Sequence, residues 1–172
     1  MWIFATYELL RTWKQRAREV LTSSRNGKLG ARAADLEADQ GYAHVGRQMR
    51  AMQLRAVLGS PNLLERIEED LRRAHMPIRR MEFIRMSLAK HEIAKEKHSI
   101  AFAPGYGRIN FWCGALDYQM EKGHVILGNI SRRDIADELR SMSQGQPPTE
   151  SELRDFDNFM DLNASTSFDP NI

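Results

Sequence analysis

The chain has 172 residues, of which 42% are hydrophobic and 28% are charged, as in an ordinary globular protein rather than a disordered one. Its single cysteine, Cys113, excludes an internal disulfide. No window approaches the ~18 uncharged apolar residues of a membrane span, and the apolar start lacks the basic segment and cleavage site of a signal peptide. We therefore expect a cytoplasmic protein without a membrane segment.

The net charge of +2 is unevenly distributed along the chain. Residues 147–172 contain six acidic residues and one arginine, so this end carries −5 and the first 146 residues carry +7. A basic body with an acidic end is compatible with an anionic ligand such as nucleic acid. The alternative is a solvated surface with the acidic tail lying near it.

Hydrophobic periodicity predicts four helices before residue 98, over residues 2–23, 31–58, 61–75 and 77–97. Gly41 and Gly46 predict a kink or break in the second of these, because glycine costs about 1 kcal/mol in a helix interior. Ser60 and Pro61 are a typical start signal for the third helix. Four helices joined by short loops indicate a four-helix bundle.

The period changes after residue 104, and the segment 108–127 predicts a small antiparallel β-meander packed on the bundle. Ile109, Phe111 and Cys113 alternate with polar residues and Trp112, as in a strand. We expect Cys113 to be a buried, inert thiol. We expect Phe111 and Trp112 to belong to a core or an interface rather than to a base-stacking platform.

Two capping patterns predict helices near the C-terminus. Ser131 is followed three residues later by Asp134, and Thr149 by Glu152. The segment 131–139 also resembles the start of a helix-turn-helix, but an acidic helix follows where a base-reading helix is required, so a capped helix is preferred. The expected organisation is one mainly α domain over residues 1–146, followed by an acidic helix and a loose tail over 147–172.

Motifs for metal or cofactor chemistry are missing from the sequence. The five histidines show no metal-ligand spacing, and no phosphate loop or nucleophile elbow occurs. We therefore expect no metal site and no cofactor.

Arg85 and His91 are separated by five residues in the predicted helix 77–97. This pair resembles the Rx4–6H motif of HEPN domains, which are small helical bundles. The resemblance implies a dimer in which two motifs face each other, and a metal-independent ribonuclease of a toxin–antitoxin or defence system. In that reading Arg85 binds the scissile phosphate and His91 exchanges protons. The family often has a polar residue after the arginine, where this chain has Met86.

The ribonuclease hypothesis predicts RNA cleavage in EDTA that is abolished by His91→Ala without loss of the fold. Intact RNA after incubation with folded wild-type protein would contradict it. The competing interpretation is structural, because His91 continues the apolar stripe of Met81, Ile84 and Leu88 and can be a core histidine.

A non-catalytic binding module is the alternative function. Its contacts would come from the basic face of helix 77–97, namely Arg79, Arg80, Lys90, Lys95 and Lys97. Candidate partners are RNA, a second copy in a homodimer, and a cognate protein. Interspersed glutamates such as Glu82 can instead pair with these cations on a solvated face.

Overall fold

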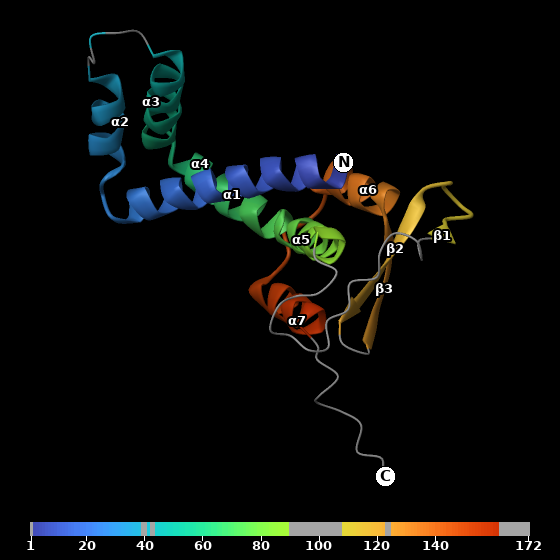
Figure 1. Cartoon of the computed structure of the whole chain (residues 1–172). Helices are drawn as coiled ribbons and strands as arrows, with labels where there is room; N and C mark the ends of the chain where they lie inside the picture. The colour runs from blue at the N-terminus through green and yellow to red at the C-terminus, as the bar shows by residue number, and fades with distance from the viewer. Residues whose placement is uncertain (1, 39–40, 42–43, 90–107, 123–124, 162–172) are drawn as a thin grey trace. The chain divides into compact units, whose positions relative to one another are not determined.

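The computed structural model describes residues 2–38, 41, 44–89, 108–122 and 125–161 (Figure 1). This part of the chain is mainly helical and carries a small antiparallel sheet, which confirms the predicted fold class. It divides into two compact units. The sheet-bearing unit comprises Met1–Leu10 and Arg72–Ile172, and the helical unit comprises Arg11–Leu71.

The helical unit is built from α1 (Trp2–Arg25), which starts in the sheet-bearing unit, followed by α2 (Leu29–Glu37), α3 (Val45–Leu58) and α4 (Pro61–Arg73). Its buried core consists of Val20, Leu29, Ala33 and Leu54. The predicted break in the 31–58 segment is confirmed, because α2 and α3 are separate helices and Gly41 has a φ of +74°. This left-handed conformation favours glycine.

The sheet-bearing unit contains α5 (His75–Ala89), β1 (Arg108–Ile109), β2 (Leu116–Lys122), β3 (Val125–Ser131), α6 (Arg132–Ser141) and α7 (Glu150–Met160). The strands pair antiparallel in the order β1-β2-β3, and α5 contacts β2, α6 and α7. The predicted inward positions Met81 and Ile84 are buried, and Ile135 of α6 is buried as well. Helix α5 is therefore the central element of this unit's core.

Both predicted capping boxes are present. The Ser131 hydroxyl accepts from the backbone of residues 133 and 134 at the start of α6, and the Thr149 hydroxyl caps α7 in the same way. The buried Ser131 also ends β3, so strand and helix follow each other without a loop. This continuity fixes the start of α6 at one end of the sheet.

Several expectations about these elements were wrong. The described chain contains five helices up to residue 89, because the predicted break divides the second one, but α5 begins at His75 instead of Pro77. The predicted strand through Ile109 and Cys113 is interrupted, because residues 111–113 form a turn. Cys113 is exposed rather than buried, and Phe111 and Trp112 project into solvent rather than joining a core. Their place in an interface stays a prediction.

No helix among the described residues is long and apolar enough to cross a bilayer.

Candidate nucleic-acid interface

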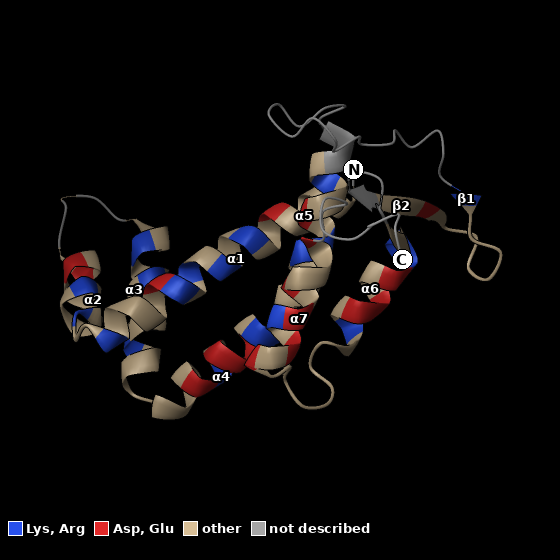
Figure 2. Ribbon diagram, turned by 90° about the horizontal axis from the view of Figure 1, so that it is seen from below, with Lys and Arg blue, Asp and Glu red and all other residues tan. Residues whose placement is uncertain are grey.

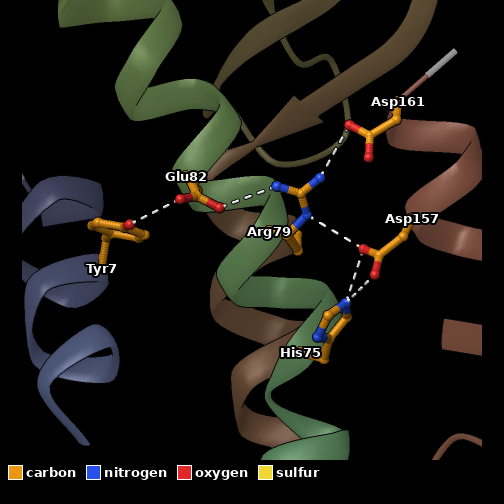
Figure 3. Close-up of polar contacts among 6 residues, drawn as sticks. All are labelled: Tyr7, His75, Arg79, Glu82, Asp157 and Asp161. Atoms are coloured by element: carbon orange, nitrogen blue, oxygen red, sulfur yellow. Dashed lines mark hydrogen bonds and ion pairs between the residues drawn. The ribbon is translucent and has the colours of Figure 1, made fainter. Parts of the chain in front are cut away.

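Arg79 lies at the centre of a polar cluster between α5 and α7 (Figure 3). Its guanidinium contacts Asp157 at 3.3 Å and Asp161 at 3.2 Å, both from the acidic end of the chain. It also pairs with Glu82 one turn along α5 at 3.2 Å. Partial burial lowers the pKa of Arg79, but the hydrogen bond that Arg79 donates to Glu82 and the three carboxylate charges outweigh this effect and raise it.

His75 completes this cluster one turn before Arg79. Its Nε2 lies 2.9 and 3.0 Å from the two carboxylate oxygens of Asp157, so Nε2 carries the proton and donates it. Partial burial raises the pKa of Asp157, but the hydrogen bond from His75 and the charges of His75 and Arg79 outweigh it, so this pKa lies below its usual value. We call the contacts of His75 and Arg79 with Asp157 and Asp161 the α5–α7 clasp.

The two remaining arginines of α5 that the sequence singles out are also held by acidic residues of the sheet-bearing unit. Arg80 pairs with Glu138 of α6 at 2.8 Å and stacks over the ring of Phe156, 5.3 Å from its centroid. Arg85 lies 3.4 Å from Glu8 of α1 and 5.2 Å from the centroid of the Tyr7 ring.

A phosphate could therefore reach Arg79, Arg80 or Arg85 only by competing with a carboxylate that is already present. Arg85 contacts α1, whereas the other two contact α6 and α7, so the three do not converge on one surface. The predicted partners His91, Lys90, Lys95 and Lys97 lie outside the described residues. Catalysis by Arg85 and His91, and binding through the basic face of 77–97, stay predictions.

The turn between β1 and β2 is organised by Asn110. Its Oδ1 accepts from the backbone N–H of Trp112 at 2.9 Å and of Cys113 at 3.2 Å, while its Nδ2 donates to Asp117 at 3.1 Å. The backbone N–H of Gly114 donates to the Asn110 carbonyl, and Gly114 has a φ of +65°. The turn is thus held at both ends by hydrogen bonds.

This ordered turn presents two aromatic side chains to solvent. Phe111 is 102% exposed and Trp112 is 96% exposed, although such residues are normally buried at least in part. Both therefore stand free of the core of the sheet-bearing unit, on a backbone that the Asn110 side chain holds in place.

Three arginines lie at the same end of the sheet as this turn. The strand register aligns Arg108 with Asp117 and Asp117 with Ser131, so Arg108 and the start of α6 share the turn's end of the sheet. Arg108 and Arg132 have neither an ion pair nor a side-chain hydrogen bond among the described residues. We call the exposed residues at this end the turn patch: Arg108, Phe111, Trp112, Arg132 and Arg133.

An open hollow separates the turn from α6. It is lined by Asn110, Trp112, Cys113, Arg133, Asp134 and Asp137. The two carboxylates in it are engaged, because Asp134 accepts from the Ser131 backbone and Asp137 accepts from Arg133 and Arg140, each at 2.7 Å. Neither of these two carboxylates is therefore free to pair with Arg108 or Arg132.

Exposed aromatic rings next to arginines can stack bases and neutralise phosphates. Sequence reasoning missed this site, because the apolar alternation at 109–113 resembles a buried strand. The signal that could have found it is the Asn110 to Gly114 spacing, since asparagine and glycine are turn residues. Figure 2 shows Lys and Arg positions in blue at β1 and at the start of α6.

Among the described residues, no group of three histidine, cysteine or acidic side chains could hold a metal ion. The chain matches no protein-family model, no curated protein and no solved structure.

Proposed function

We propose that the chain is a non-catalytic binding module for single-stranded nucleic acid and that the turn patch is its contact surface. One observation carries the proposal. Phe111 and Trp112 are almost completely exposed on an ordered turn, and at the same end of the sheet Arg108 and Arg132 have no acidic partner among the described residues.

The bases of a single strand are available for stacking on the two rings, whereas the bases of a duplex stack on one another. Each base stacked on an aromatic side chain contributes about 1–3 kcal/mol. The Asn110 hydrogen bonds hold the turn before any ligand binds, so little backbone entropy is lost on binding. The nearby arginines supply the phosphate contacts.

A fluorescence-anisotropy titration with a labelled single-stranded RNA tests the proposal. Wild-type protein is expected to bind with a Kd on the order of 1–100 μM at physiological salt, the range of sequence-independent binding. Trp112→Ala is expected to weaken binding about tenfold through the loss of one stacking platform. Phe159→Ala is the matched control, because Phe159 is a 42% exposed aromatic residue of α7 outside the turn patch.

Parallel titrations with single-stranded DNA and with duplex RNA define the ligand. Equal binding of the two single strands indicates stacking and backbone charge alone, whereas a preference for RNA indicates contacts to the 2′-hydroxyl. Absence of binding at low salt, or an affinity that Trp112→Ala leaves unchanged, would refute the proposal. A protein as the true partner would give this negative result.

A further inference from the structure

Helix α3 has apolar residues on two opposite faces. Ala51 and Leu54 face the core of the helical unit and are 2% and 1% exposed. On the opposite side Val45, Met49 and Met52 are 66%, 58% and 71% exposed, and Ala56 is exposed as well. Spacings of four, three and four residues place Val45, Met49, Met52 and Ala56 within an arc of about 60° around the helix axis. We call these four residues the α3 stripe.

The edges of the stripe carry little net charge. Gln48 and Gln53 flank it, and α3 contains no acidic residue (Figure 2). The one flanking cation, Arg55, is held by Glu37, with its Nε and Nη2 3.0 and 2.7 Å from the carboxylate oxygens. An acidic partner helix would therefore find no unpaired cation beside the stripe, whereas a second copy of α3 would meet no uncompensated like charge.

The α3 stripe also has complementary ends. When two copies lie antiparallel about a two-fold axis between Met49 and Met52, the large Val45 faces the small Ala56 of the partner subunit, and Met49 faces Met52 of the partner subunit. A parallel arrangement would place valine against valine and alanine against alanine, which leaves a gap at one end. Methionine side chains adapt readily to such a seam.

From this geometry we infer that the chain forms a homodimer through antiparallel pairing of the α3 stripes. The seam is about three helical turns long. The area buried by a seam of this length is smaller than the ~1,200 Å² of a standard stable interface, so the dimer dissociates on dilution. This inference does not depend on nucleic-acid binding by the turn patch.

Sedimentation equilibrium of the full chain over about a hundredfold range of concentration tests the inference. The mass of the wild type is expected to rise from 19.8 kDa toward twice that value. Met49→Glu/Met52→Glu is expected to weaken the dimer at least about tenfold, because charges are placed in an apolar seam. Gln15→Glu/Asn62→Glu is the matched control, since it adds two charges at exposed positions of the helical unit outside the stripe and should still dimerise.

Cross-linking tests the orientation. In a Cys113→Ser background, Met49→Cys/Met52→Cys should form disulfide-linked dimers, whereas Met49→Cys alone should not; efficient cross-linking of the single variant would overturn the antiparallel order. A wild type that stays at 19.8 kDa at every concentration would overturn the dimer itself. A large drop in the thermal midpoint of Met49→Glu/Met52→Glu relative to wild type, both measured at a concentration where the wild type is monomeric, would do so too, because the stripe would then be packed within one chain.

Discussion

Replacing both Arg108 and Arg132 with glutamate is expected to weaken the binding of single-stranded RNA about 100-fold. Each substitution removes a phosphate contact and adds a charge that repels the strand. Neither residue has an ion pair or a side-chain hydrogen bond among the described residues, so the fold loses no observed interaction. The measurement is an anisotropy titration at several salt concentrations. The slope of log K against log salt should become shallower, from about −2 to about −0.6, at ~0.7 per phosphate contact.

The matched control for this variant is Arg66→Glu/Arg154→Glu. It changes the net charge by the same amount at two exposed arginines outside the turn patch. An equal loss of affinity in the control would mean that the total charge attracts the strand rather than the local surface. Unchanged affinity in Arg108→Glu/Arg132→Glu would remove the turn patch as the phosphate-contacting surface.

Local chemistry decided which elements the sequence could predict. The starts of α6 and α7 follow from Ser131 with Asp134 and from Thr149 with Glu152, because a capping box needs only residues three positions apart. The break between α2 and α3 follows from Gly41, whose positive φ few other residues adopt. Such signals need no knowledge of the rest of the fold.

Residues 109–113 show where local pattern reasoning fails. Apolar alternation predicts a strand with a buried face, but the side chain of Asn110 replaces the ladder hydrogen bonds with contacts to the next backbone N–H groups. The same apolar residues therefore stand in solvent as a turn. Alternation alone favours a strand, but the hydrogen bonds to the Asn110 side chain stabilise a turn instead.

The partners of the α5 arginines could not be predicted either. Arg79 meets Asp157 across 78 positions of sequence, and Arg80 meets Glu138 across 58. Helical spacing alone indicated Glu82 as a partner of Arg79, and that pair is present. The charge asymmetry of the sequence was compatible with an acidic end near a basic surface, but the pairing of individual residues depends on how α7 packs on α5.

Asp157→Asn is expected to loosen α7 from α5 by about 2 kcal/mol, because Asp157 accepts hydrogen bonds from both His75 and Arg79. Its side chain is 38% exposed, which keeps this cost below the ~3–5 kcal/mol of breaking a fully buried pair. Hydrogen exchange followed by mass spectrometry over Glu150–Met160 measures the effect. Protection of this helix should fall about thirtyfold at neutral pH.

The pH dependence separates this electrostatic role from a merely structural one. A carboxyl group whose pKa is depressed in the folded protein stabilises it above the unfolded pKa, ~3.9 for aspartate, and loses this effect as pH falls through the folded value. The difference in protection between wild type and Asp157→Asn should therefore shrink as the pH falls below ~4. Asp155→Asn, at an exposed position of α7, should leave protection unchanged. A difference that persists unchanged at low pH would mean that Asp157 acts through its shape and not through its charge.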